Sequence, residues 1–120
     1  MTKKVLIVED NALNMRLFTD VLTMTGLEVV QVMDGHVAVA EITSHKPDLV
    51  LMDIHIDDVS GLDVTREVRQ NPELTMPIIA VTAFTSEEDK KAIAESGCTG
   101  YIPKPIDITD FVTKVHAALA

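Results

Sequence analysis

Cysteine is almost missing from this sequence of 120 residues, which contains only Cys98. A single cysteine supports neither a disulfide framework nor a cysteine-based zinc site. We therefore interpret Cys98 as a small residue in or beside the core. The four histidines match no known spacing of transition-metal ligands; they are His36, His45, His55 and His116.

Long apolar runs are also missing. No stretch of 18 apolar residues is present, and the start of the chain leads into only four apolar residues before Glu9, too few for a signal-peptide core. We expect a cytoplasmic protein that does not contact a membrane. A chain of this length builds its own core, and it begins at Met1 and contains no linker-like tract. We therefore expect one domain over residues 1–120, with no effector domain.

Positive charge is scarce, with 10 Lys and Arg against 19 Asp and Glu and a net charge of −9. An acidic domain repels nucleic-acid phosphates, so we expect no direct nucleic-acid partner. The excess of carboxylates serves solubility or forms a divalent cation site, and a cation site requires that they cluster locally.

What the sequence does contain is a strict alternation of strands and helices. Apolar strands are predicted at 4–8, 28–32, 49–53, 78–82 and 100–103. The helices between and after them are predicted to start at Asn11, to cover 37–44 and 62–70, to start after Ser86, and to cover 108–118. This alternation predicts an α/β fold with a parallel sheet and helices on both faces. In the first helix, Leu17, Phe18, Val21 and Leu22 predict the buried stripe.

A carboxylate ends the most apolar strand. Residues 49–52 are Leu-Val-Leu-Met, and Asp53 follows them. A strand that is apolar at every position is buried on both faces, so Asp53 is predicted at the carboxyl edge of the sheet, where α/β proteins place their ligands. The same edge receives Glu9 and Asp10 from the first strand, Thr82 from the fourth and Lys104 from the fifth.

These residue types fit one chemistry. Three converging carboxylates repel one another, and a divalent cation relieves the repulsion; Mg²⁺ is preferred because the protein supplies few ligands. One of the carboxylates can then act as a nucleophile towards a phosphoryl group whose oxygens are neutralised by the metal, by Lys104 and by Thr82. Each residue alone has an ordinary explanation, as a helix-start acid, a strand-end hydroxyl or a surface lysine. Their common edge favours the joint site. Asp57 and Asp58 are interpreted as solvated loop charges, with contact to the metal site through water as the alternative.

Five motifs resemble the receiver domains of two-component response regulators (CheY-like domains) over the whole chain. They are Glu9-Asp10-Asn11, Met52-Asp53, Gly61, Val81-Thr82-Ala83 and Lys104-Pro105. The resemblance implies a flavodoxin-like (βα)5 fold with strand order 2-1-3-4-5. It also implies that Asp53 is the phosphoacceptor and that Asp10 and Asp53 bind Mg²⁺. The main-chain carbonyl of His55 is implied as a further ligand, with Glu9 acting mostly through water.

The resemblance implies further roles. Lys104 pairs with the phosphoryl group and precedes a cis proline, and Thr82 and Tyr101 form a switch pair. That pair serves an output face built from the helix after Ser86, the strand 100–103 and the helix 108–118. Such a domain catalyses only its own phosphorylation and dephosphorylation. His55 and Phe84 occupy positions that border the phosphoryl group, and we predict that they tune the lifetime of the aspartyl phosphate by controlling access of water.

The partners predicted are a histidine kinase or a histidine phosphotransfer protein at the sheet edge. We expect Leu13 and Ile106 to contact the kinase helices, with burial in the core as an equal alternative. The possible functions are a stand-alone receiver that binds partners when phosphorylated, a phosphorelay intermediate, and the receiver of a hybrid kinase or DNA-binding regulator. A fourth is a Mg²⁺ phosphatase of the haloacid-dehalogenase type. His55 counts against it, because those enzymes carry an aspartate two residues after the nucleophile.

Within the family, the sequence most resembles the DivK-type stand-alone receivers of cell-cycle signalling. The matching residues are 5–11, Asn14, Phe18, Gly97-Cys98 and Tyr101-Ile102. The chain departs from the family pattern at Asp57, where receivers commonly have proline four residues after the acceptor. This departure predicts a more mobile and more acidic loop.

Overall fold

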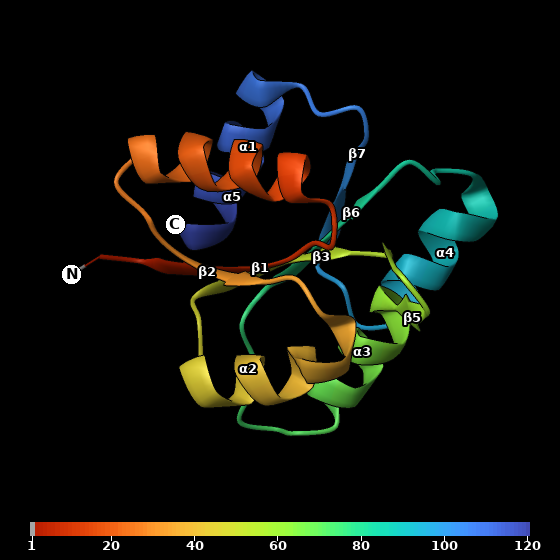
Figure 1. Ribbon diagram of the computed structural model, residues 1–120. Helices are drawn as coiled ribbons and strands as arrows, with labels where there is room; N and C mark the ends of the chain where they lie inside the picture. Colours follow the sequence, from red (N-terminus) through yellow and green to blue (C-terminus); the bar gives the residue numbers. More distant parts are fainter. Residues whose placement is uncertain (1) are drawn as a thin grey trace.

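A five-stranded parallel sheet forms the centre of the computed structural model, which describes residues 2–120 (Figure 1). Its strands are β1 (Lys4–Val8), β2 (Glu28–Val32), β3 (Leu49–Asp53), β6 (Ile78–Thr82) and β7 (Gly100–Pro103). They lie in the order β2-β1-β3-β6-β7, and every pairing is parallel. This is the predicted order 2-1-3-4-5, because β4 (His55–Ile56) and β5 (Val59–Ser60) form a separate antiparallel hairpin.

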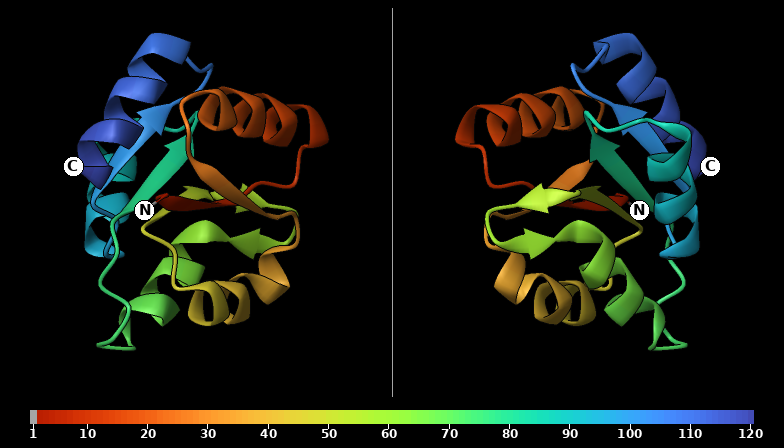
Figure 2. Two further views of the ribbon diagram at one scale, coloured as in Figure 1. Left: turned by 90° about the vertical axis from the view of Figure 1, so that its left-hand side faces the viewer. Right: turned by 90° about the vertical axis from the view of Figure 1, so that its right-hand side faces the viewer.

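Helices cover both faces of the sheet. They are α1 (Ala12–Met24), α2 (Ala38–His45), α3 (Gly61–Arg69), α4 (Glu87–Glu95) and α5 (Ile108–Leu119), with a 3-10 turn at Gly35–Val37 before α2. Helices α1 and α5 lie on one face and α2 and α3 on the other, and Figure 2 shows the sheet between these layers. No helix within residues 2–120 combines the length and the apolar composition that crossing a bilayer requires.

The alternation of side chains along the strands creates two core layers. Odd-numbered residues such as Val5 and Leu51 pack with Phe18 of α1 and Phe111 of α5, whose rings stack 5.2 Å apart. Even-numbered residues such as Leu6 and Met52 pack instead against α2 and α3. Strand β3 is buried at all five positions. Apolar burial on both faces therefore fixes β3 rigidly and carries its last residue to the edge of the sheet.

Local signals set most helix ends. The Asn11 side chain accepts a hydrogen bond from the Asn14 amide at 2.9 Å, which caps α1. Ser86 and Asp89 form the predicted capping box of α4. After α1 the chain turns at Gly26, whose φ of +88° lies in the left-handed region that favours glycine. The predicted starts of α1 and α4 are confirmed.

Two expectations about local structure are wrong. Leu17 is 39% exposed, and the buried stripe of α1 is Met15, Phe18 and Leu22, since residues three and four apart share a helix face. The helix predicted at 37–44 is confirmed as α2, and the 3-10 turn before it, where the Asp34 side chain accepts a hydrogen bond from the His36 amide, was not predicted. The loop after Asp53 contains the β4–β5 hairpin.

Candidate functional site

Strand register brings the predicted residues to one edge of the sheet. Val8 pairs with Met52, which places Glu9 beside Asp53, the next residue of each strand. Asp53 pairs with Val81, which places Thr82 one residue beyond. Thr82 in turn pairs with Pro103, and the main-chain amide of Lys104 donates to the Thr82 carbonyl at 2.8 Å. The acids, the hydroxyl and the lysine thus follow four different strands and lie together at one edge of the sheet.

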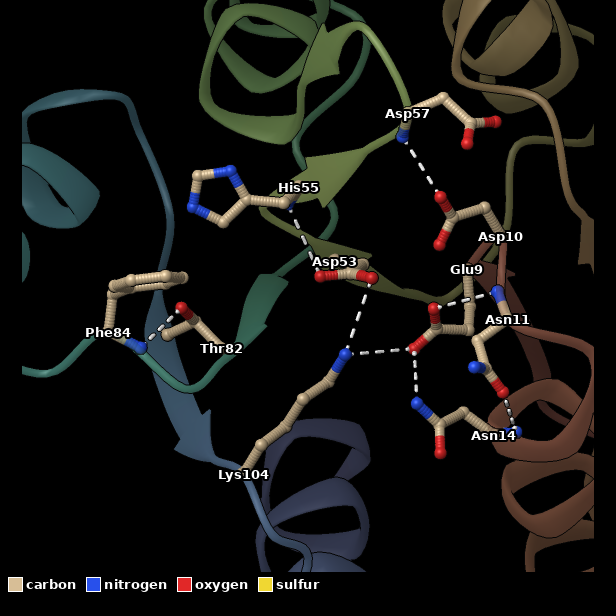
Figure 3. Close-up of polar contacts among 10 residues, drawn as sticks. All are labelled: Glu9, Asp10, Asn11, Asn14, Asp53, His55, Asp57, Thr82, Phe84 and Lys104. Atoms are coloured by element: carbon tan, nitrogen blue, oxygen red, sulfur yellow. Dashed lines mark hydrogen bonds and ion pairs between the residues drawn. The ribbon is translucent and has the colours of Figure 1, made fainter.

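The Lys104 ammonium lies between two buried carboxylates (Figure 3). Its Nζ is 3.1 Å from Glu9 Oε1 and 3.3 Å from Asp53 Oδ2, and Glu9 and Asp53 are only 1% and 6% exposed. Burial disfavours the charged ammonium. Attraction to Asp53 and Glu9 more than offsets that cost, so the pKa of Lys104 is raised. One cation therefore holds two acids together inside the protein.

Glu9 is held in place by three donors. Its Oε2 accepts the Asn11 amide at 3.2 Å, and its Oε1 accepts Asn14 Nδ2 at 3.5 Å as well as Lys104. Burial, together with the neighbouring Asp53 carboxyl, raises the pKa of Glu9 to about 7, although the Asn11 amide and Lys104 act in the opposite direction. The contact of Asn14 with Glu9 was not predicted. The only feature of the sequence that could have indicated this contact is the position of Asn14, whose amide side chain lies in the first turn of the helix that follows Glu9.

Asp10 completes an acidic cluster with Glu9 and Asp53. One carboxylate oxygen from each residue lies within 4.8 Å of the other two. A hard divalent cation such as Mg²⁺ binds oxygen ligands. It takes only a few of them from the protein and keeps water molecules in its remaining coordination positions. The donor set therefore fits Mg²⁺, which the predicted chemistry needs.

The residues that follow Asp53 orient its carboxylate and pack closely against its main chain. The His55 amide donates to Asp53 Oδ1 at 3.3 Å, and the Gly61 amide donates to the Ile54 carbonyl at 2.7 Å. A Cβ atom on Gly61 would collide with the main-chain carbonyl oxygen of Asp53. Glycine at position 61 therefore lets the start of α3 approach the end of β3 closely.

Two aromatic side chains flank Asp53 on the Thr82 side (Figure 3). The rings of His55 and Phe84 meet edge to face with their centres 4.7 Å apart, and Phe84 is 53% exposed. The Phe84 amide donates to Thr82 Oγ1 at 2.9 Å, which ties this ring pair to the buried threonine. The structure thus brings both residues of the lifetime prediction into contact with each other.

Tyr101 lies apart from the acidic cluster, on β7 between α4 and α5. Its half-buried ring has Lys90 of α4 and Lys114 of α5 near it, each with Nζ 5.8 Å from the ring centre. Thr82 is at the cluster and Tyr101 is on the α4–β7–α5 face. The peptide bond between Lys104 and Pro105 is cis, as the resemblance implied.

The two residues predicted to contact a kinase differ in exposure. Leu13 is 80% exposed, so its burial in the core is excluded. Ile106 is partly buried against the core layer of α1 and α5. Ile106 also lines an open groove of about 480 Å³ with Leu17, Asn14 and Lys104. An apolar surface therefore runs from α1 to the edge of the acidic cluster.

The acidic loop is anchored at both of its turn residues. The Asp57 amide donates to Asp10 Oδ2 at 2.9 Å, and the Asp58 carboxylate lies 2.9 Å from His36 Nε2. The contact with His36 lowers the pKa of Asp58, while repulsion from Asp10 raises the pKa of Asp57. The side chains of both residues are exposed, as predicted. These two bonds explain how the loop is held without proline.

Comparisons with known proteins agree on one family. The family model described as "Response regulator receiver domain" matches residues 5–116. The polar-differentiation response regulators DivK of Brucella ovis and Brucella anthropi are 44% and 43% identical over 99% of this chain and 98% of theirs. The chemotaxis protein CheY4 of Vibrio cholerae superposes with a TM-score of 0.93 at 26% identity, covering 99% of this chain and all of that one. A response regulator of Chloroflexus aurantiacus gives 0.92 at 29%, over 99% and 98% of the two chains.

The raised pKa of Glu9 predicts a specific pH dependence of stability in metal-free protein. Glu9 keeps its proton up to about pH 7 when folded but loses it near pH 4.5 when unfolded. The free energy of unfolding contributed by Glu9 therefore falls as the pH rises between these values. Relative to Glu9→Gln, which cannot ionise, the unmodified protein should lose roughly 1 to 3 kcal/mol between pH 4.5 and 7.5.

Urea unfolding in EDTA at several pH values measures this difference. Glu73→Gln, which removes an exposed carboxylate, is the matched control and should follow the unmodified protein. Parallel pH curves for Glu9→Gln and the unmodified protein would show that Glu9 ionises normally and that the buried site is wrongly described.

Proposed function

Because this chain belongs to the response regulator receiver family, we propose that Asp53 accepts a phosphoryl group from a histidine kinase in the presence of Mg²⁺. Phosphorylation and Mg²⁺ binding are general properties of that family. The observation that supports Asp53 as the acceptor is its position: a nearly buried carboxylate that contacts Lys104 at 3.3 Å beside the acidic cluster. The protein then signals by binding partners.

Transfer of the phosphoryl group is a direct displacement. An Asp53 carboxylate oxygen forms a bond to phosphorus while the bond from phosphorus to the donor's imidazole nitrogen breaks. The electron pair of that bond returns to the nitrogen, and the product is an acyl phosphate. Lys104 moves from pairing with the free carboxylate to pairing with a phosphoryl oxygen, and the Thr82 hydroxyl donates to another.

Glu9, Asp10, Asp53 and the main-chain carbonyl of His55 are the proposed Mg²⁺ ligands, with Glu9 acting mostly through water. The ion supplies positive charge to the phosphoryl oxygens in the transition state. The chain's own contribution is to keep three carboxylates facing one point, which Lys104 makes possible by neutralising part of their charge. The protein acts on its own phosphoryl group and not on external phosphate esters.

The output of the switch is the α4–β7–α5 face. The phosphoryl group adds about two negative charges and strong acceptor oxygens next to Thr82. We propose that the Thr82 hydroxyl turns towards the phosphoryl oxygen and that Tyr101, two positions away from Thr82 in the β6–β7 ladder, turns inward. The half-buried Tyr101 ring between two lysines would then change the surface that a partner meets.

Similarity to the DivK proteins supports a proposal about the process in which this protein acts. This chain spans 98% of the DivK proteins, which are called polar-differentiation response regulators. We propose that it acts as a stand-alone regulator in the control of cell division. A phosphorelay intermediate is the second candidate, because the exposed Leu13 and the apolar groove fit a phosphotransfer protein as well as a kinase.

The acceptor assignment predicts the behaviour of Asp53→Asn. With acetyl phosphate and Mg²⁺, the unmodified protein should gain one phosphoryl group by intact mass, and Asp53→Asn should gain none. Asp20→Asn, which removes an exposed acid paired with Arg16 on α1, should be labelled normally. Labelling of Asp53→Asn at the normal rate would contradict the assignment. Reverse transfer from the labelled protein to a histidine phosphotransfer domain separates the relay from the stand-alone switch.

The docking assignment predicts a selective defect in Leu13→Glu. The new charge should slow transfer from a phosphohistidine protein donor at least tenfold, which corresponds to about 1.4 kcal/mol, and leave labelling by acetyl phosphate unchanged. Met24→Glu is the control, because Met24 is 86% exposed at the other end of the same helix. Equal transfer rates for Leu13→Glu and Met24→Glu would refute the assignment.

If the rings of His55 and Phe84 shield the acyl phosphate from water, removing either ring should speed loss of the phosphoryl group. His55→Ala and Phe84→Ala should each raise the decay rate after donor removal by roughly threefold or more, because water reaches the acyl phosphate more easily. Ile108→Ala removes an equally exposed apolar side chain elsewhere and should decay normally. If both variants retain the lifetime of the unmodified protein, the ring pair does not limit hydrolysis.

A further inference from the structure

The turn between β4 and β5 has an unusual backbone at its first residue. Asp57 and Asp58 are the two residues that join Ile56 to Val59, and φ of Asp57 is +52°. Two-residue hairpin turns need a left-handed residue at this place, because its twist matches that of the paired strands. Asp tolerates this conformation and proline, fixed near −65°, does not. In this hairpin, residue 57 must therefore be able to adopt a left-handed backbone, which excludes proline.

This backbone presents the Asp57 amide to the acidic cluster. The N–H donates to Asp10 Oδ2 at 2.9 Å, across 47 residues of sequence. Asp10 is also the least enclosed member of the cluster, since Glu9 and Asp53 are buried and each contacts Lys104. Within residues 2–120, the Asp57 amide is the only donor found within hydrogen-bond distance of the Asp10 carboxylate. One main-chain bond thus orients Asp10.

Other contacts fix the amide itself. The β4–β5 ladder pairs Ile56 with Val59 on either side of the turn, and the Asp58 carboxylate lies 2.9 Å from His36 Nε2. The turn is therefore tied both to its own hairpin and to the 3-10 turn before α2. A donor held in this way orients its acceptor more firmly than one on a free loop.

The Asp57 carboxylate has no comparable role. Figure 3 shows it directed away from Asp53, while the amide points to Asp10. Within residues 2–120 no cationic side chain lies within 4 Å of it. The contribution of residue 57 to the site is thus made by the main chain.

We propose that Asp57 is a positioning residue for the metal ligand Asp10. Its left-handed backbone directs the N–H to Asp10 Oδ2 and leaves the other oxygen of Asp10 facing Glu9 and Asp53. The proposal rests on the Mg²⁺ site of the proposed function. The hydrogen bond itself can be observed without any metal.

Three substitutions of Asp57 separate the main chain from the side chain. Asp57→Gly and Asp57→Asn keep the N–H and the left-handed backbone and remove the charge, whereas Asp57→Pro removes both the donor and the conformation. Calorimetric titration with Mg²⁺ alone should show about tenfold weaker binding for Asp57→Pro, the usual cost of losing a partner of a metal ligand. Asp57→Gly and Asp57→Asn should stay within about threefold, because the lost carboxylate is exposed and screened.

Amide hydrogen exchange in metal-free protein tests the bond directly and does not depend on how well the proline variant folds. The residue 57 amide should exchange at least tenfold faster in Asp10→Ala than in the unmodified protein. Equal exchange rates would overturn the proposal, as would equal Mg²⁺ affinity for Asp57→Pro and the unmodified protein, or an equal loss in Asp57→Gly and Asp57→Pro. Absence of Mg²⁺ binding in the unmodified protein would instead refute the proposed function and this role of Asp57 with it.

Discussion

The contact of one ammonium with two buried carboxylates is the interaction on which this structure depends. Glu9, Asp10 and Asp53 converge at the edge of the sheet, and like charges at such distances disfavour one another. Lys104 lies 3.1 and 3.3 Å from two of them and makes the arrangement tolerable. Its neutralisation is incomplete, since one positive charge faces three acids. The remaining negative charge is what a divalent cation can neutralise, and with the cation bound the cluster no longer repels an anionic phosphoryl group.

The fold fixes the positions of Glu9 and Asp53, the two carboxylates that Lys104 contacts. Strands β1 and β3 are apolar and buried on both faces, so a slip in register would draw the acid at the end of the strand, Glu9 or Asp53, into the core. The register places Glu9 beside Asp53, and Gly61 allows α3 to begin against the carbonyl of Asp53. The same sheet joins Thr82 at the cluster to Tyr101 on a different surface. The sheet therefore links the cluster rigidly to the α4–β7–α5 face, which is the output face of the proposed switch.

Most of the sheet edge could be predicted from the sequence, because it follows from short-range patterns. The apolar run ending in Asp53 and the acids after the first strand both indicated the carboxyl edge of a parallel sheet. Asn14 could not be assigned to Glu9, since its contact depends on how α1 leaves β1. The strands β4 and β5 have two residues each, too few to show alternation. Residue 57 looked like a solvated charge because its contribution is made by an amide, which every residue except proline carries.

The most direct test measures stability with and without Mg²⁺ for the unmodified protein and Asp10→Asn. Replacing Asp10 removes repulsion within the cluster but leaves Lys104 with both of its partners. In EDTA, Asp10→Asn should therefore have a higher free energy of unfolding than the unmodified protein. Added Mg²⁺ should stabilise the unmodified protein, as a ligand of the folded state does, and should leave Asp10→Asn nearly unchanged. Equal stabilisation of both proteins by Mg²⁺, or of neither, would contradict the central claim that these carboxylates form a cation site.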